Sequence, residues 1–185
     1  DCRARAASIR AANPRLESTA LVMKAIKTAK SWAAGVGAAS GVVANPLAML
    51  PAASAEIGYV LRAEAALTGV IAALLDPPSL DDPEAFSADI LSVVFPGAVS
   101  QALRELGVKA GQATTRTLIR KYVSKGVLRA IIKFAARWLG IKLTQKAILT
   151  KAIPLVGALI GGAWNWIEVE RIGRRAMAYY EEQTE

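Results

Sequence analysis

The sequence predicts an all-α protein, a compact bundle of about six to eight helices built on a hydrophobic central hairpin. Apolar residues recur at steps of three and four, Pro and Gly divide the chain into stretches of helical length, and no stretch shows the period-two alternation of a strand. The chain has 185 residues, of which 54% are hydrophobic, so it is the size of one domain but apolar for a soluble one. We therefore treat residues 1–185 as a single domain with apolar surface to bury or to offer to a partner.

Two helices and a break are predicted in the first half of the chain. Residues 1–12 are basic and rich in Ala and are expected to fray, and Asn13 is placed to cap a helix over Pro14–Trp32. Residues 33–55 carry no charge and are long enough to cross a bilayer, but their Gly, Asn and Pro residues favour a broken, buried connection. A helix over Pro51–Leu75 is apolar nearly all round, which is typical of the centre of a bundle.

Shorter helices are predicted in the second half, before one long final helix. The acidic turn at Asp81 and Asp82 leads into Pro83 and Glu84, which together form a cap and first-turn signal for a helix over Ala85–Phe95. Four further helices or turns follow: Ala98–Leu106, Gln112–Ser124, a helix from Lys125 to a stop at Gly140, and Lys142–Thr150. The final helix is expected over Pro154–Tyr180, with its Pro in the first turn.

The final helix is predicted to be amphipathic and to organise the bundle. Residues that recur at steps of three and four define its core face: Leu155, Leu159, Gly162, Trp166, Val169, Gly173, Ala176 and Tyr180. The opposite stripe is polar: Asn165, Glu168, Arg171 and Arg175. Gly157 and Gly161 are spaced so that another backbone can approach closely, which favours tight packing in water or helix association in lipid.

The net charge of +8 is concentrated in one block. Residues 106–167 contain no Asp or Glu but eleven Lys and Arg residues, four of which form a basic ridge along one helix: Lys125, Arg129, Lys133 and Arg137. A basic, Trp-bearing helix is typical of contact with anionic lipid headgroups, although such a ridge can equally be a solvated face. Lys151 and Asn165 complete the predicted headgroup site, unless Asn165 simply begins the polar stripe. Nucleic acid is a weaker prediction, because the block is strongly apolar and has no recognition-helix or RNA-stacking signature.

The residue content excludes most common catalytic and metal sites. The chain has no His and one Cys, so it lacks His-based acid–base chemistry, Cys–His nucleophiles, zinc sites and disulfides within one chain. Glu56 and Glu64 lie about 12 Å apart along a helix, which is too far for a paired-carboxylate site. We therefore predict that the protein is not an enzyme and uses no cofactor or metal. One Cys and the absence of a signal-peptide pattern favour a cytoplasmic, peripherally membrane-associated protein.

Two further sets of residues are expected inside the bundle. Glu64 falls on an apolar stripe, so it or Glu56 should meet a cation from the later half of the chain, with Lys151 as the best candidate. Small residues in the two long apolar helices leave room for a lipid cavity, although the same residues allow gap-free packing. The residues predicted to line that cavity are Leu61, Ile71, Leu155, Leu159, Gly161 and Trp166.

Two segments within residues 49–180 carry a distinctive set of residues. The first has Leu50, Pro51, Ala55 and Glu56, and the second has Lys151, Pro154, Gly157, Gly161, Asn165, Arg171, Ile172, Gly173 and Ala176. In these residues the chain resembles the EcsC family of bacterial proteins. The resemblance implies one all-α EcsC-like domain with a role in membrane physiology or secretion, and it implies no catalytic reaction. The Pro-rich break at Asp76–Ser79 departs from the Gly-containing turn that the family pattern leads us to expect.

Three classes of function follow from these features. The first is a lipid-binding, membrane-associated protein that holds phospholipid acyl chains in an apolar cavity and contacts anionic headgroups through a basic face. The second is a non-enzymatic regulatory protein that docks on a membrane transporter or secretion complex. The third, an enzyme, has no supporting set of residues. We favour the first, because a lipid ligand accounts for both the apolar content and the cationic surface.

Overall fold

The computed structural model describes residues 1–41, 46–105, 129–137, 140 and 154–184. The secondary structure of these residues is helical, and no strand occurs among them, which confirms the predicted all-α fold. The helices are α1 (Cys2–Ala12), α2 (Ser18–Gly41), α3 (Pro46–Leu75), a 3-10 helix η1 (Pro78–Asp81), α4 (Pro83–Val94), α5 (Pro96–Glu105) and α8 (Pro154–Thr184). Residues 129–137 are helical as well.

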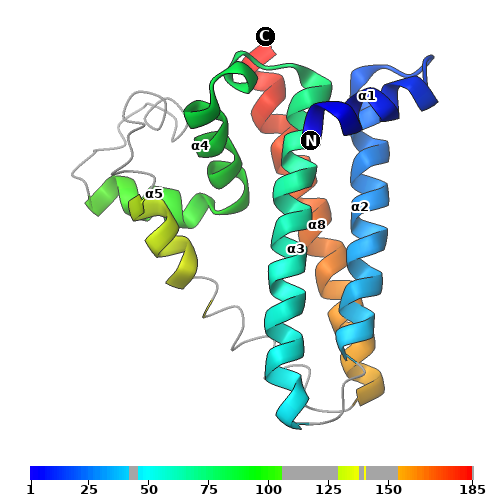
Figure 1. Ribbon diagram of the computed structural model, residues 1–185, viewed down its shortest axis with the longest axis vertical. Helices are drawn as coiled ribbons and strands as arrows, with labels where there is room; N and C mark the ends of the chain where they lie inside the picture. Colours follow the sequence, from blue (N-terminus) through cyan, green and yellow to red (C-terminus); the bar gives the residue numbers. More distant parts are fainter. Residues whose placement is uncertain (42–45, 106–128, 138–139, 141–153, 185) are drawn as a thin grey trace.

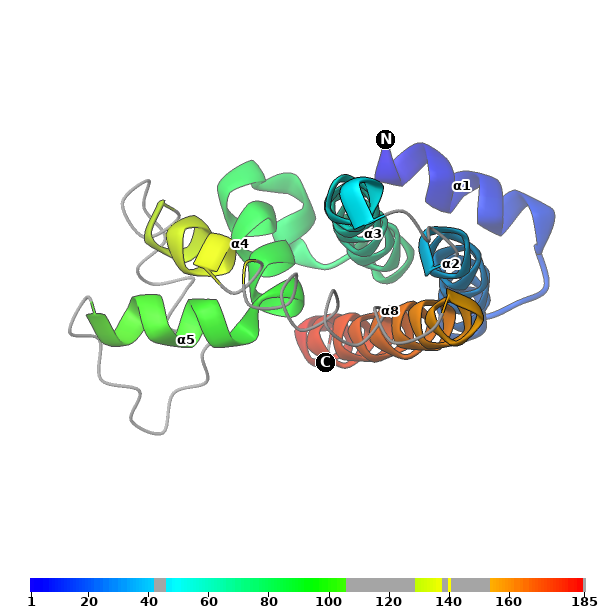
Figure 2. The same ribbon diagram turned by 90° about the horizontal axis from the view of Figure 1, so that it is seen from below.

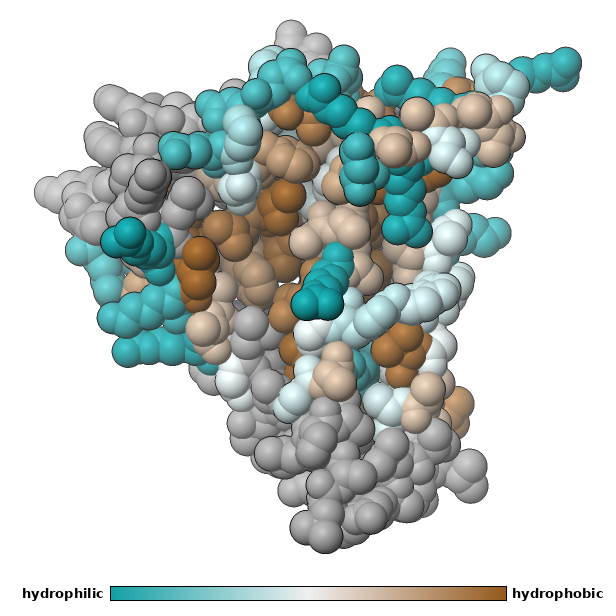
Figure 3. Space-filling view, viewed as in Figure 1, coloured by the Kyte–Doolittle hydropathy of each residue, from teal (hydrophilic) through white to brown (hydrophobic). Residues whose placement is uncertain are grey.

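Three long helices, α2, α3 and α8, lie side by side and form the central bundle (Figures 1 and 2). The helix α1 crosses one end of this bundle, and α4, α5 and residues 129–137 form a second group beside it. Hydrophilic side chains gather at the end that α1 crosses and around the second group, whereas apolar side chains appear between that group and α3 (Figure 3).

The core of the bundle is made mainly by branched aliphatic side chains from all three long helices, with one buried Tyr. Its fully buried members include Val22, Ile26, Ile71, Leu74, Val169 and Tyr180. Because a fully buried aliphatic side chain stabilises a fold by about 1.5–3 kcal/mol relative to exposure, this shared core holds the three helices together.

The second group has a smaller core of its own. Apolar residues of α4, α5 and the helical residues 129–137 meet there: Ala88, Ala98, Val99, Leu103, Ile131 and Phe134. The axes of α4 and α5 differ in direction by 113°. The bend falls at Phe95, since a residue before Pro is disfavoured in the helical conformation, and the following Pro96 suits the first turn of α5.

The backbones of α2 and α8 are in close contact at two glycines. A Cβ atom added to Gly161 would lie 2.4 Å from the carbonyl oxygen of Gly37, and one added to Gly37 would lie 2.3 Å from the carbonyl oxygen of Gly161. Real Cβ atoms do not approach a backbone oxygen this closely, so the crossing requires both glycines. Gly161 therefore serves gap-free helix packing, and the prediction that it borders a lipid cavity is wrong.

The N-terminal segment differs from the prediction. Residues 1–12 do not fray: Asp1 caps α1, Ala6 is buried, and the Arg10 guanidinium donates a hydrogen bond of 2.7 Å to the carbonyl of Leu74 in α3. Asn13 ends α1 instead of starting the next helix, because its backbone N–H donates to the carbonyl of Arg10 at 3.0 Å. The helix α2 consequently begins at Ser18 and not at Pro14.

The predicted break between the first two long helices is also misplaced. The helix α2 continues past Trp32 to Gly41, and α3 begins at Pro46 and continues through Pro51 without interruption. A Pro suits a first turn, and a second Pro in the next turn removes one backbone hydrogen bond without ending a helix that tertiary packing supports. The cap predicted in the acidic turn of Asp81 and Asp82 is present at Asp82, whose carboxylate accepts from the backbone N–H groups of Glu84 and Ala85.

The helix α8 has the predicted start but a rotated core face. Val169, Gly173, Ala176 and Tyr180 are buried as predicted, but Leu159 is 75% exposed and Asn165 only 1% exposed. The close approach at Gly161 turns this side of α8 toward α2, which carries Asn165 inward and Leu159 outward. The prediction that Asn165 begins the solvent-facing polar stripe is therefore wrong.

Replacing Gly161 with Ala should destabilise the protein by about 1–3 kcal/mol, because the new methyl group would force the two backbones apart. Gly35→Ala is the matched control on α2, since nothing lies within 4 Å of a Cβ atom there. That change should be stabilising by about 0.5–1 kcal/mol through the higher helix propensity of Ala. Urea unfolding measures both; equal effects of the two substitutions would contradict a tight contact at Gly161.

Candidate functional site

A pocket of about 430 Å³ lies between α8 and the junction of α4 and α5, two regions that are close together in Figure 2. Apolar side chains make up most of its wall: Val94, Phe95, Pro96, Ala98, Trp164, Ile167 and Ile172. Gly97 and three charged residues, Glu168, Arg171 and Arg175, complete the lining. An apolar pocket with a few convergent polar groups is the usual form of a small-molecule site.

The charged groups of the pocket come from successive turns of α8. Arg171 is exposed, whereas Arg175 is half-buried and its Nη1 donates a hydrogen bond of 2.8 Å to the carbonyl oxygen of Val93. The Glu168 carboxylate accepts a hydrogen bond of 3.1 Å from Nε1 of Trp164. The spacing of three and four residues places all of these side chains on the side of α8 that faces the α4–α5 junction.

The electrostatics of the pocket favour a bound anion. Burial lowers the pKa of the Arg175 guanidinium, and the like charge of Arg171 lowers it further, while Glu64 and Glu168 act in the opposite direction. A lowered pKa of a cation means that its surroundings oppose the positive charge. An anionic group placed beside Arg171 and Arg175 would relieve part of that cost.

A cluster of buried polar groups joins the three long helices α2, α3 and α8. Nδ2 of Asn165 in α8 donates to Oε1 of Glu56 in α3 at 2.7 Å and to the carbonyl oxygen of Ala33 in α2 at 3.1 Å. The hydroxyl of Ser40 donates to the other carboxylate oxygen of Glu56. Asn165 is thus committed to the interior of the bundle, and the prediction that it contacts a lipid headgroup is wrong.

The two carboxylates predicted to be internal are both buried. Glu56 and Glu64 are 5% and 1% exposed. The charge of Glu64 interacts with that of Arg175, a cation from the later half of the chain. Lys151, which we expected as the partner, lies outside the described residues.

The residues predicted to line a cavity between α3 and α8 are dispersed in the structure. Ile71 is fully buried in the bundle core, Leu61 is half-buried, and Leu159 and Trp166 are exposed. The side chain of Leu155 is outside the described part of the structure. Together with the contact at Gly161, these positions do not define one cavity. The pocket between α8 and the α4–α5 junction is lined by Trp164 and Ile167, which neighbour Trp166 in sequence but lie on a different side of α8.

The predicted basic ridge is present where the structure describes it. Arg129, Lys133 and Arg137 are exposed, while Ile131 and Phe134 turn inward against α4 and α5. Lys125 lies outside the described residues. The described part of this helix is therefore amphipathic, with its cations available to an anionic partner.

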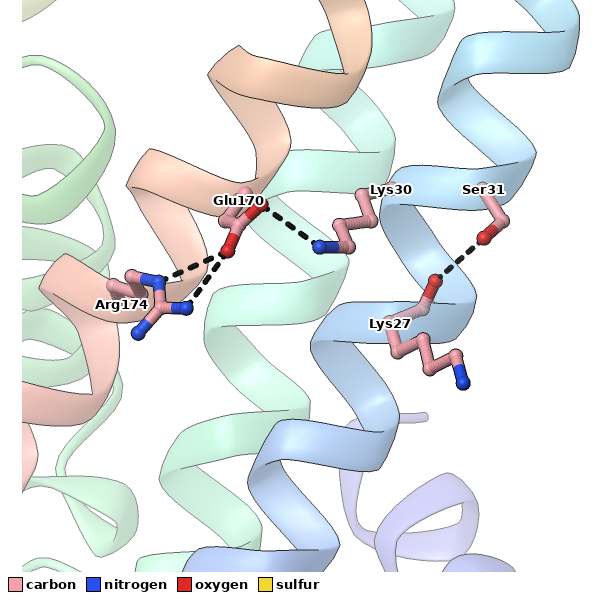
Figure 4. Close-up of polar contacts among 5 residues, drawn as sticks. All are labelled: Lys27, Lys30, Ser31, Glu170 and Arg174. Carbon is pink, nitrogen blue, oxygen red and sulfur yellow. Dashed lines mark hydrogen bonds and ion pairs between the residues drawn. The ribbon is translucent and has the colours of Figure 1, made fainter.

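A charged triad links α8 to α2 beside this site (Figure 4). The Lys30 ammonium lies 2.8 Å from Oε2 of Glu170, and Arg174 donates from Nε and Nη2 to Oε1 of the same carboxylate at 3.1 and 2.8 Å. On α2, the Ser31 hydroxyl donates back to the carbonyl of Lys27. Hydrogen bonds from Lys30 and then Arg174 lower the pKa of Glu170 below its ordinary value.

The sequence does not predict this pocket. The sequence predicts Arg171 and Arg175 on a polar stripe and Phe95 at the end of a helix, and it predicts no contact between these two regions. The only local signal was that apolar Ile167 adjoins a polar stripe. The residues that face the polar stripe of α8 come from α4 and α5. Their position depends on long-range contacts between the second group of helices and α8, which local sequence patterns do not predict.

Comparisons with protein-family models, with curated proteins and with solved structures find no match to this chain. The resemblance to the EcsC family stays a prediction. Among the described residues, no group of three acidic or Cys side chains could hold a metal ion. Ser54–Leu75 of α3 is long and apolar enough to cross a membrane, but 56% of its most apolar stretch is buried inside the protein, and a core helix of a soluble bundle meets the same criterion.

The lowered pKa of Glu170 predicts a pH dependence of stability. A carboxyl group whose pKa is lowered by folding contributes stability above its unfolded pKa, and this contribution is lost as the pH falls through its folded pKa. The free energy of unfolding of the wild type should therefore decrease below about pH 4 more steeply than that of Glu170→Gln. Urea unfolding across this range measures it, with Glu105→Gln, an exposed position on α5, as the control for loss of one charge. Parallel curves for the wild type and Glu170→Gln would contradict the triad.

Proposed function

We propose that the protein is a non-enzymatic lipid-binding protein that holds an acyl chain of a phospholipid or related anionic lipid in the pocket between α8 and the α4–α5 junction. The observation that carries this proposal is the combination of an apolar wall with Arg171 and Arg175 in one pocket. The wall can take up hydrocarbon, and the two guanidinium groups can bind a phosphate or carboxylate headgroup through charge-assisted hydrogen bonds.

The size of the pocket limits the ligand. Its volume of about 430 Å³ lies near the lower end of the range of small-molecule pockets. It suits one acyl chain better than the two chains of a complete diacyl phospholipid. A second chain of such a lipid would remain outside the pocket, in a membrane or against the protein surface.

The exposed cations of residues 129–137 support a role at a membrane surface. Arg129, Lys133 and Arg137 face outward from a helix that is anchored to α4 and α5, the elements that also form one side of the pocket. Each cation near an anionic bilayer contributes about 1 kcal/mol of attraction. We propose that this basic face holds the protein at the membrane from which the lipid comes.

A binding titration with a fluorescent single-chain lysophosphatidylglycerol tests the proposal. Arg171→Gln should weaken binding about ten-fold or more, because a hydrogen bond between charged groups contributes about 1.5–3 kcal/mol. Ile167→Asp should weaken it similarly, because it places a charge in the apolar wall. Both residues are exposed, so neither change removes core packing.

The matched controls lie outside the pocket. Arg104→Gln removes an exposed cation of α5, and Ile132→Asp alters a residue that is 56% exposed, against 55% for Ile167. Both controls should bind the probe like the wild type. Equal weakening by the pocket and control variants, or no binding by the wild type, would refute the proposed site.

A further inference from the structure

We infer that the pocket selects a lipid whose headgroup carries an ammonium group together with its anionic groups, and that Glu168 is the residue that determines this selectivity. The selectivity depends on the lipid pocket proposed above and narrows its ligand. Any anionic lipid would satisfy Arg171 and Arg175, whereas an amino lipid would also satisfy the carboxylate that lines the same pocket.

The carboxylate of Glu168 is held in the pocket wall. Glu168 is half-buried, and its Oε2 accepts a hydrogen bond of 3.1 Å from Nε1 of Trp164, another lining residue. This bond fixes the carboxylate at the end of the pocket where Trp164 lies, and a group that is already oriented loses less entropy when a ligand binds it. A carboxylate has about four acceptor positions, so the bond from the indole is compatible with a donor on the ligand.

The two cations of the pocket are not neutralised by this carboxylate. Arg171 follows Glu168 by three residues, a spacing at which opposite charges on a helix commonly pair. In the described part of the structure, however, the Arg171 side chain is exposed and forms no ion pair and no hydrogen bond. Arg175 donates to a neutral group, the carbonyl of Val93, through one of its five N–H bonds. The pocket therefore presents one negative and two positive charges, with both cations available to a ligand.

The three charges follow one another along α8. Arg171 lies about 4.5 Å beyond Glu168 along the helix axis, and Arg175 lies about 6 Å beyond Arg171. From the start of α8 toward its end, the pocket thus presents a negative charge and then two positive charges. The complementary headgroup has an ammonium group at one end and anionic groups beside it. A phosphoserine headgroup, with one ammonium, one carboxylate and one phosphate group, has this set of charges.

The carboxylate opposes a ligand that has only anionic groups. Burial and then the charge of Arg171 lower the pKa of Arg175, and Glu64 and Glu168 oppose this change. The charge of Glu168 therefore reaches a cation two helical turns away, and it would repel an anion bound to that cation. Because the wall is largely apolar, the repulsion is screened less than in water. An ammonium group on the ligand adds an attraction to Glu168 that offsets this repulsion.

A purely structural role of Glu168 makes a different prediction. If the side chain serves only to hold Trp164 in the wall, Glu168→Gln should leave the choice of headgroup unchanged, since the amide oxygen of Gln can accept the same indole hydrogen bond. If the charge of Glu168 recognises an ammonium group, the same substitution should remove the choice. The substitution thus separates the two roles at nearly constant shape.

Competition against the fluorescent lysophosphatidylglycerol measures the choice with two unlabelled lipids of the same acyl chain. Lysophosphatidylserine carries an ammonium group and lysophosphatidylglycerol does not, but their net charge at neutral pH is the same, so general attraction to a basic protein is equal for both. The wild type should bind lysophosphatidylserine about ten-fold more tightly, which is the size of effect that one hydrogen bond between charged groups can produce.

Glu168→Gln should abolish this preference. Its binding of lysophosphatidylserine should be about ten-fold weaker than that of the wild type, and its binding of lysophosphatidylglycerol should be at least as tight. Glu105→Gln is the matched control, because it removes one negative charge at an exposed position of α5 outside the pocket, and it should keep the preference. Both variants should keep the helical circular dichroism of the wild type.

Acetylation of the lipid amine tests the same contact without a change to the protein. N-acetylated lysophosphatidylserine lacks the ammonium charge and should lose its advantage over lysophosphatidylglycerol in the wild type. Equal binding of lysophosphatidylserine and lysophosphatidylglycerol by the wild type, or a preference that survives in Glu168→Gln, would overturn the inference and leave the proposed lipid pocket standing. Binding of neither lipid by the wild type would refute the pocket, and the inferred selectivity with it.

Discussion

The close crossing of α2 and α8 at Gly37 and Gly161 is the constraint on which the rest of the structure depends. With no side chain between the backbones, the contact sets which side of α8 faces α2 at this point. That rotation turns Asn165 inward, where it donates to Glu56 of α3 and so ties the third helix to the other two. Burial of a carboxylate is tolerable because Asn165 and Ser40 supply the hydrogen bonds that water would otherwise provide.

The pocket to which we assign function follows from the same rotation. Once Asn165 faces inward, Arg171 and Arg175 face the α4–α5 junction, where the second group of helices supplies an apolar wall. The same rotation leaves Leu159 and Trp166 exposed. The helix α8 therefore presents cations to the pocket and apolar side chains to solvent, which explains why its sequence is amphipathic without having a single core face.

The sequence was sufficient for the fold class, the start of α8 and the cap at Asp82, because each rests on periodicity or on a local hydrogen bond. It was not sufficient for the rotation of α8 about its axis. Periodicity predicts that polar Asn165 is exposed and apolar Leu159 is buried, but the structure has Asn165 buried and Leu159 exposed. The close contact at Gly161 outweighs hydrophobic periodicity at these positions. The sequence predicts that the first long helix ends at Trp32 and the next begins at Pro51, because Gly and Pro disfavour helix. In the structure α2 extends to Gly41 and α3 begins at Pro46, since packing between long helices overrides such local preferences. The pocket depends on docking between distant segments, for which local patterns carry no information.

We propose that a lipid occupies the pocket between α8 and the α4–α5 junction. Native mass spectrometry of the chain purified from cells without detergent tests it most directly. We predict a population whose mass exceeds that of the bare chain by one anionic lipid, and this added mass should be absent from the Arg171→Gln, Arg175→Gln double variant while the folded charge-state distribution is retained. Bare-chain mass alone in the wild type, with no lipid in an organic extract of the same sample, would contradict the claim.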